Sequence, residues 1–167
     1  LGVLAGLAMA ANFVTMYMLF EMMSLITVPM VLHNGTSAAR RAGFKYLGYS
    51  VFGAGMALAG YFFIAYYMAA PDFAAGGAID PVRAAQHRPL LLVIYCLMIV
   101  GFGAKAGMVP MQAWLPAAHP VAPAPASAVL SGVITKAGVL AVIRVTYYMF
   151  GVDFLQGSWP QYVLLAL

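Results

Sequence analysis

Long apolar runs separated by short polar segments constrain the fold of this chain more than any other feature. The hydrocarbon core of a bilayer is about 30 Å thick, so an α-helix crosses it with about 20 apolar residues. In lipid, backbone amides must be satisfied within the protein, which leaves helices and closed barrels as spanning structures. The runs show no alternation typical of strands. The chain is therefore predicted to be an all-α, polytopic transmembrane helix bundle.

Composition supports a membrane protein and excludes several functions. Charged residues make up 7% of the chain and hydrophobic residues 65%, whereas a soluble domain carries about 25% charged residues. The net charge of +4 comes from scattered basic residues, so it does not indicate a nucleic-acid partner. The single cysteine, Cys96, lies in an apolar run and offers neither a disulfide nor a CxxC metal or redox site. A lipid bilayer is the expected environment.

The apolar runs predict about five spans, centred near residues 22, 55, 98, 137 and beyond 160. The predicted helices cover residues 1–11 (partial), 13–32, 42–68, 90–107 followed by a half-helix at 111–118, 124–150, and 161–167 (partial). Pro110 separates the two halves of the fourth element, which is therefore expected to be one discontinuous, proline-broken helix. We interpret residues 1–167 as a single transmembrane domain that is a piece of a longer subunit.

The polar segments between the spans are expected to be loops. Thr36 or Ser37 is expected to cap the helix that follows the first loop. Pro71–Pro89 shows no strong helical pattern and is expected to be an exposed loop. Arg40 and Arg41 favour a cytoplasmic first loop, but the second loop also holds two arginines, so the charge distribution leaves the orientation open.

Two lysines lie inside apolar sequence on either side of a proline-rich break. Lys105 ends one run, Lys136 lies near the middle of the next, and neither has an adjacent acid. A charge in hydrocarbon costs at least about 2.5 kcal/mol, so such residues mark protein-lined or water-filled pathways. Lys136 is too deep to reach an interface by snorkelling. Lys105 has a structural alternative, because free carbonyls at a helix end also favour a cation.

Three further residues are candidates for proton transfer, each with a structural alternative. Glu21 lies about 12 Å along its helix from Phe13, which places a carboxyl group near the bilayer middle. Lys45 is either a relay residue or an interface anchor. His119 lies between prolines, where it is either a solvated loop residue or a proton relay between the two lysines.

The motifs around these residues resemble the proton-conducting antiporter-like family, which comprises membrane subunits of complex I, group 4 hydrogenases and Mrp-type antiporters. The resemblance rests on Lys105, Pro110, Trp114-Leu115-Pro116, Ala118-His119, Ser127, Ser131-Gly132 and Lys136. Phe20-Glu21-Met22-Met23-Ser24 resembles the family's glutamate motif, and Gln112 stands where a histidine usually precedes Trp-Leu-Pro. The resemblance implies one repeat of five helices from a longer subunit.

The resemblance also implies a function. Glu21 and Lys105 would form an ion pair that gates a half-channel, with Lys136 as the central relay residue, and we expect the pair to be in direct or water-bridged contact. The function implied is proton translocation by a non-redox subunit of a complex I-like NADH:quinone oxidoreductase or a membrane-bound hydrogenase, in a bacterial cell membrane and beside other membrane subunits. No catalytic, cofactor-binding or metal-binding residue is expected. Two alternatives stay open: a Na⁺(cation)/H⁺ antiporter subunit of the Mrp type, and a scaffold whose charges only pin helices.

Overall fold

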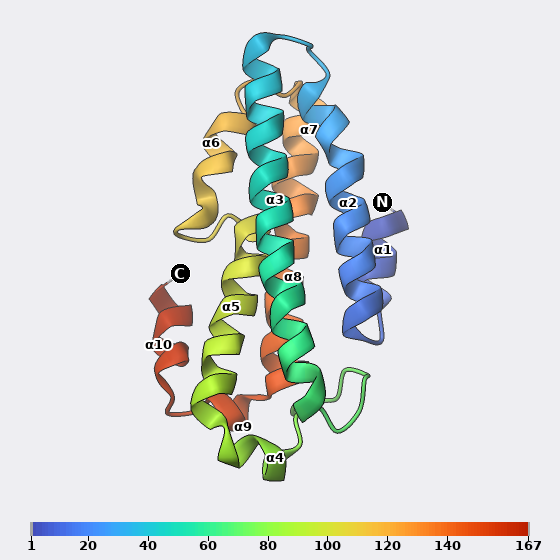
Figure 1. The fold of residues 1–167 in the computed structure, drawn as a ribbon. Helices are drawn as coiled ribbons and strands as arrows, with labels where there is room; N and C mark the ends of the chain where they lie inside the picture. Colours follow the sequence, from blue (N-terminus) through green and yellow to red (C-terminus); the bar gives the residue numbers. More distant parts are fainter. Residues whose placement is uncertain (1, 167) are drawn as a thin grey trace.

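The structure is a computed structural model that describes residues 2–166. Its regular elements are helices, and several of them run nearly parallel or antiparallel in one elongated bundle (Figure 1). Within the described residues, four helical segments are long and apolar enough to cross a membrane: Phe13–Leu32, Ser37–Tyr67, Arg88–Ala118 and Ala124–Phe150. The predicted all-helical class, with bent helices, is confirmed.

Helices α1 (Gly2–Met9) and α2 (Phe13–Leu32) pack side by side. A tight turn joins them, and the Asn12 side chain caps α2 by accepting a hydrogen bond of 2.9 Å from the backbone N–H of Thr15. This bond satisfies one of the amide groups that a helix start leaves without an internal partner. The side chain of Leu19 fills the space beside Gly6, which holds the two helices close together.

Helix α3 (Ser37–Ile64) continues into the 3₁₀ turn η1 (Ala65–Tyr67). Thr36 caps it by accepting from the backbone N–H of Ala39 at 3.1 Å, as the sequence predicts. Because the cap is at Thr36, α3 begins at Ser37, five residues before the predicted start at residue 42. Both arginines of the predicted loop therefore lie in the first turns of α3. Arg40 and Arg41 are therefore helical residues at one end of the bundle.

The segment expected to be a loop contains a short helix, α4 (Pro81–Gln86). Asp80 caps it by accepting from the Val82 N–H at 2.9 Å, and Pro81 occupies the first turn, where its missing N–H costs nothing. Isolated antiparallel bridges also pair Met68 with Ile79 and Asn12 with Asp72. Most of the segment is exposed, as expected for a loop, but residues 81–86 form a helix of fewer than two turns, which is too short to show a periodic pattern.

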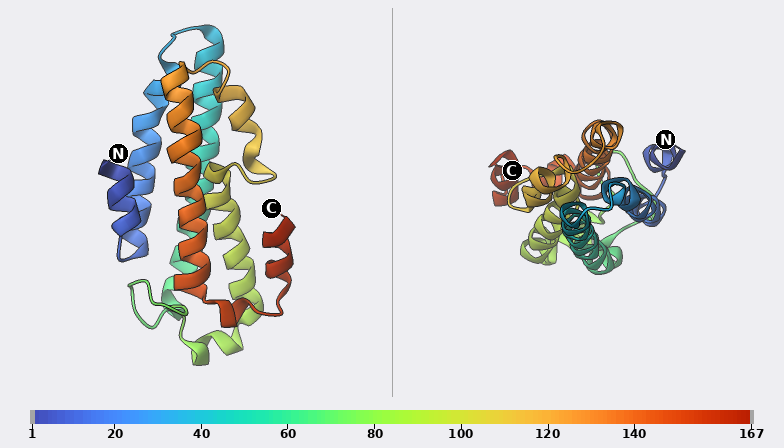
Figure 2. Two further views of the ribbon diagram at one scale, coloured as in Figure 1. Left: turned by 180° about the vertical axis from the view of Figure 1, so that it is seen from behind. Right: turned by 90° about the horizontal axis from the view of Figure 1, so that it is seen from above.

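The broken helix has the expected form. Helix α5 (Arg88–Ala106) ends at Gly107, whose φ of 81° is left-handed, a conformation that favours glycine. The chain resumes after Pro110 as the 3₁₀ turn η2 (Met111–Trp114) and helix α6 (Leu115–Ala118). Figure 2 shows this second half displaced sideways from the axis of α5 and running up beside α3. The discontinuous helix is confirmed.

The last long span is one rod with two π-helical turns. It comprises α7 (Ala124–Val129), η3 (Leu130–Ile134), α8 (Thr135–Arg144) and η4 (Val145–Phe150). The short helix α9 (Val152–Leu155) turns the chain, and α10 (Trp159–Ala166) follows, starting two residues before the predicted 161. π-Turns often lie at functional sites, and η3 immediately precedes the turn that carries the second lysine.

Small residues allow α5 to sit close to its neighbours in the centre of the bundle. A Cβ atom added to Gly53 of α3 would lie 2.5 Å from the carbonyl oxygen of Gly101 in α5. On the other side of α5, a Cβ atom on Gly138 of α8 would clash with the backbone of Ala106. Such close backbone approach is typical of helix contacts in lipid. It places the last turn of α5, with Lys105, between α3 and α8.

Candidate functional site

Lys105 lies in the protein core. Its side chain is 1% exposed and extends from the last turn of α5 toward α2 and α3. Its ammonium group donates a hydrogen bond to the hydroxyl of Ser24 in α2 and another, at 3.4 Å, to Ser50 in α3. A buried ammonium group needs polar partners to offset the loss of water. The two serines supply oxygen acceptors without adding a negative charge.

Two aromatic rings complete the surroundings of the lysine. The Nζ atom lies 5.4 Å from the ring centre of Phe20 and 5.0 Å from that of Tyr46, both within cation–π range. The Tyr46 hydroxyl hydrogen-bonds to Thr27 at 2.7 Å, and Thr27 in turn donates to backbone carbonyls of α2. We call the four hydroxyl-bearing residues Ser24, Thr27, Tyr46 and Ser50 the hydroxyl cradle.

Trp114 fixes the second half of the broken helix against this cradle. Its buried indole N–H donates to the carbonyl of Ala104 at 2.6 Å, and its ring centre lies 4.9 Å from that of Tyr46. Ala104 precedes Lys105, and its carbonyl is one of the acceptors that a helix end leaves without a partner inside the helix. The indole therefore caps the lysine-bearing helix end and also packs against the cradle.

Glu21 is half-buried on α2, one turn before Ser24, and its buried Oε1 atom has no hydrogen-bond partner among the residues that the structure describes. Its carboxylate does not pair directly with Lys105, because Arg83–Asp80, at 3.4 Å, is the one ion pair within 4.0 Å among residues 2–166. The ion pair implied by the resemblance is therefore not formed directly in this structure, where hydroxyl groups hold the ammonium group instead. A water-bridged contact between the two residues stays a prediction.

Lys136 lies at about the same level of the bundle as Lys105. It is on the outer side of α8, whereas Gly138 of the same helix faces α5. Its neighbour Gly138 touches the backbone of Ala106, next to Lys105. The Lys136 side chain itself is exposed, on an outer stripe of α8 that includes Val139 and Ile143. The helical turns that carry Lys105 and Lys136 are therefore in backbone contact. Within the described residues, the two ammonium groups do not form one cluster.

His119 and Lys45 occupy two further environments. His119 is half-buried at the end of α6, and its Nδ1 atom lies 2.7 Å from the Ser127 hydroxyl at the start of the next helix. This contact joins the broken helix to the helix that carries Lys136. Lys45 is exposed on the outer face of α3, beside an apolar groove. In the described part of the chain, no hydrogen bond or ion pair links it to the other predicted relay residues.

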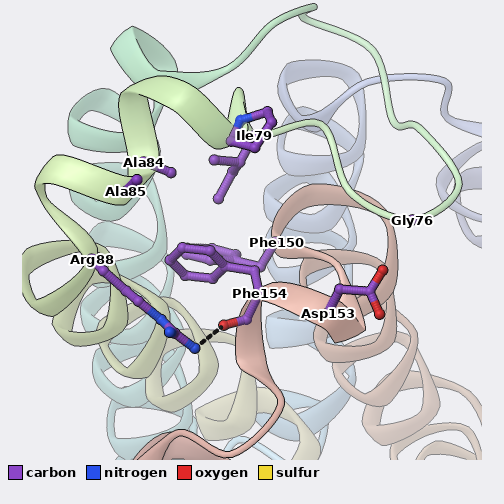
Figure 3. Close-up of a pocket in the computed structure, with 9 residues that line it drawn as sticks. Gly76, Ile79, Ala84, Ala85, Arg88, Phe150, Asp153 and Phe154 are labelled. Atoms are coloured by element: carbon purple, nitrogen blue, oxygen red, sulfur yellow. Dashed lines mark hydrogen bonds between the residues drawn. The ribbon is translucent and has the colours of Figure 1, made fainter.

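A separate cavity of about 520 Å³ lies at the opposite end of the bundle, between α4 and α9 (Figure 3). Phe150 and Phe154 lie side by side in its wall, and Arg88, also in the wall, donates to the Phe154 carbonyl at 3.1 Å. None of the predicted relay residues lines this cavity. Residues 2–166 also contain no group of three or more His, Cys, Asp or Glu side chains placed to hold a metal ion.

The family described as "NADH:quinone oxidoreductase/Mrp antiporter, TM" matches residues 10–167 of this chain. The chain belongs to this family. Its relatives include Hydrogenase-4 component B of Escherichia coli K12, 35% identical over 76% of this chain and 18% of that protein. NADH-quinone oxidoreductase subunit N of Thermobifida fusca is 34% identical over 85% of this chain and 27% of that protein.

A solved structure shares the fold of this antiporter-family chain. The membrane-bound sulfane sulfur reductase, an archaeal respiratory membrane complex, contains a chain that superposes with a TM-score of 0.70 at 21% identity, over 94% of this chain and 30% of the other. Members of the family are subunits of multi-subunit membrane complexes. The chain spans about a fifth to a third of the length of the relatives it matches.

Sequence reasoning missed the cradle of this antiporter-family chain. Ser24 was noted only as the end of the glutamate motif, and Thr27, Tyr46 and Ser50 had no assigned role. One signal was present: Thr27 follows Ser24 at i+3, and Ser50 follows Tyr46 at i+4, so each pair shares one face of its apolar helix. The packing of these two faces around the same lysine depends on how α2, α3 and α5 assemble.

Proposed function

We propose that this chain forms part of the proton path in an antiporter-like membrane subunit of a complex I-like NADH:quinone oxidoreductase or a membrane-bound hydrogenase. Glu21, Lys105, Lys136 and His119 are its protonatable groups. The observation that carries the proposal is the buried Lys105 ammonium group in a cradle of hydroxyl groups. Ser24 of this cradle lies one helical turn after Glu21, whose buried Oε1 atom has no hydrogen-bond partner among residues 2–166. A purely structural lysine would be expected to pair with that carboxylate.

The cradle suits a group that changes protonation state. A hydroxyl group both donates and accepts hydrogen bonds, so Ser24 and Ser50 satisfy a lysine ammonium group and then, by rotating, a neutral amine. A fixed carboxylate partner would favour the charged lysine only. The Tyr46–Thr27 pair extends the hydroxyl groups along α2 and α3. In this proposal, Glu21 takes up a proton and Lys105 passes one on through intervening water.

Lys136 is the next proposed group along the path. Its exposed ammonium group lies near the middle of a span, where contact with lipid tails would be costly. We therefore propose that another membrane segment of the longer subunit covers this face of α8 and lines a hydrated path there. The contact of Gly138 with Ala106 places this face at the depth of Lys105. His119, held by Ser127, is the proposed link toward the loop end.

An Mrp-type Na⁺(cation)/H⁺ antiporter subunit is the second candidate function, because the family description includes those antiporters. It would use the same groups to exchange cations without an electron-transfer partner. The two functions differ in their driving force. Proton movement that requires electron transfer in the parent complex supports the first, and proton movement driven by an imposed Na⁺ gradient alone supports the second.

The test uses the full-length protein in its native complex, reconstituted into vesicles that report internal pH. Lys105→Ala is expected to lower the proton yield per electron transferred to below a tenth of the native yield, because the path loses a protonatable group. Arg83→Gln is the matched control, since Arg83 is a surface cation paired with Asp80 outside the bundle core. A Lys105→Ala complex that assembles and pumps like the control would contradict the proposal.

A further inference from the structure

The outer face of α3 carries a groove of about 450 Å³ that the proton path does not use. Its lining consists of Phe44, Lys45, Gly48, Tyr49, Phe52 and Met111. Two of the aromatic side chains are largely exposed, Phe44 at 71% and Phe52 at 62%. Met111, at the start of η2, forms the opposite wall because the broken helix resumes beside α3. Most of the lining is apolar, and its polar side chains are Lys45 and Tyr49.

Within residues 2–166, the cations near this groove form no ion pair. Lys45 is exposed, and Arg41, four residues earlier on the same helical face, is exposed as well. The sequence holds four acidic residues. Within residues 2–166, Glu21 lies in α2, whereas the three aspartates belong to the segments around α4 and α9 at the opposite end of the bundle (Figure 1). An anion from outside the chain would therefore complement this pair.

The groove lies at the depth expected for a lipid. The span Ser37–Tyr67 has 31 residues, hence a length of about 46 Å against a hydrocarbon thickness of about 30 Å, so its first turns extend to the level of the headgroups. Lys45 lies about 12 Å along the helix from Ser37, where its long side chain reaches the headgroup region by snorkelling. The apolar wall formed by Gly48 and Phe52 lies deeper, at the level of the acyl chains.

We propose that this groove binds an anionic phospholipid. The phosphate lies between Lys45 and Arg41, and one acyl chain runs along Gly48 and Phe52 against Met111. Basic residues at the membrane surface attract anionic lipids by about 1 kcal/mol each. A transmembrane helix of a partner subunit fits less well, because it would bury Lys45 away from water and would need an acidic residue at that point. Lys45 thus serves in lipid binding rather than in the proton relay.

The test measures the lipid that remains bound to the full-length protein in nanodiscs of phosphatidylcholine containing a minor fraction of phosphatidylglycerol, by native mass spectrometry. Lys45→Gln is expected to reduce bound phosphatidylglycerol about fivefold, the factor that corresponds to about 1 kcal/mol. Arg40→Gln, which removes the neighbouring cation from a different helical face, is the matched control and is expected to change binding little.

A second pair of variants tests the apolar wall. An added Cβ atom at Gly48 would meet no atom within 4 Å, so Gly48→Trp fills the groove without disturbing the fold and is expected to displace the lipid. Gly55→Trp makes the same change in equally open space two turns deeper on α3, beyond the lining residues. Equal retention of both lipids by the native protein, or equal effects of the two tryptophans, would overturn the proposal. Loss of a partner subunit from Gly48→Trp with bound lipid unchanged would also overturn it, because a protein would then occupy the groove.

Discussion

At the scale of single residues, the central feature is a buried cation held by neutral groups. Lys105 has two serine hydroxyls and two aromatic faces as neighbours, while the nearby Glu21 keeps a buried oxygen without a partner. A fold selected for stability alone would pair the two charges, because an uncompensated buried charge is strongly destabilising. In the relay proposed above, this arrangement leaves Lys105 without a carboxylate partner that would fix its charged form.

Removing the cradle hydroxyls is expected to weaken both stability and transport. Ser24→Ala deletes an acceptor of the ammonium group, and hydrogen bonds to charged groups contribute about 1.5–3 kcal/mol. We expect a lower unfolding temperature in a thermal unfolding assay and a reduced proton yield in vesicles. Ser158→Ala, which removes another buried serine hydroxyl far from Lys105, is the control. Recovery of the proton yield by Ser24→Thr, which restores the hydroxyl, distinguishes a role in transport from packing alone.

Neutralising the acid is expected to separate stability from transport. Glu21→Gln keeps the size of the side chain and removes a charge that has a buried, unpartnered oxygen. Burying a neutral amide costs less than burying a carboxylate, so the unfolding temperature is expected to stay the same or rise while the proton yield falls. The same assays measure both quantities. A large loss of stability with normal proton transfer would show that Glu21 is a structural residue.

At the scale of elements, close helix contacts put the site together. Gly53 and Gly101 bring α3 against α5, and Gly138 brings α8 against the turn that carries Lys105. The break at Gly107 and Pro110 then redirects the chain so that Trp114 returns to cap the end of α5. Arg144 adds a link between helices, since its guanidinium group donates to the carbonyls of Ala8 and Ala10 at the end of α1. The positions of the helices thus depend on small residues and on capped helix ends.

Adding one methyl group at the α5–α8 contact is expected to move the two lysine turns apart. A Cβ atom on Gly138 would clash with backbone atoms of Ala106, which cannot rotate away. Overpacking of this kind typically costs about 1–3 kcal/mol. We expect Gly138→Ala to lower the unfolding temperature and the proton yield together. Gly132→Ala on the same rod, where an added Cβ atom meets no atom within 4 Å, is expected to leave both close to native values.

At the scale of the whole molecule, the four long helical segments place charged groups at three kinds of position. Lys105 is enclosed by α2, α3 and α5. Lys136 faces outward near mid-span, and Lys45 faces outward near one end of the bundle. The chain covers only part of the length of its relatives. In the proposals above, a further membrane segment covers the face that carries Lys136, and an anionic lipid binds beside Lys45.

The proposed relay requires Lys136 to lose and regain a proton. Lys136→Ala is expected to abolish proton movement while the subunit still inserts and assembles, because an exposed side chain contributes little to the packing of the described bundle. Lys136→Arg is also expected to fail, since arginine stays protonated in proteins. Proton uptake by vesicles that carry the parent complex measures both variants. Normal pumping by the arginine variant would show that a fixed positive charge suffices and would exclude the relay role.

The sequence by itself determined the class, the spans and the break. Run length and low charge required membrane-spanning helices, and Pro110 marked the discontinuity, because these are local properties of the backbone and its solvent. The short helix after Asp80 was missed, since fewer than two turns show no clear periodicity. Only the tertiary structure decided that Lys105 contacts Ser24 and Ser50 rather than Glu21, and that Lys136 and Lys45 face outward. Such contacts depend on how each helix is rotated about its own axis. Packing between the helices sets that rotation. Because the helix surfaces are almost uniformly apolar, the sequence does not show which side of each helix faces its neighbours.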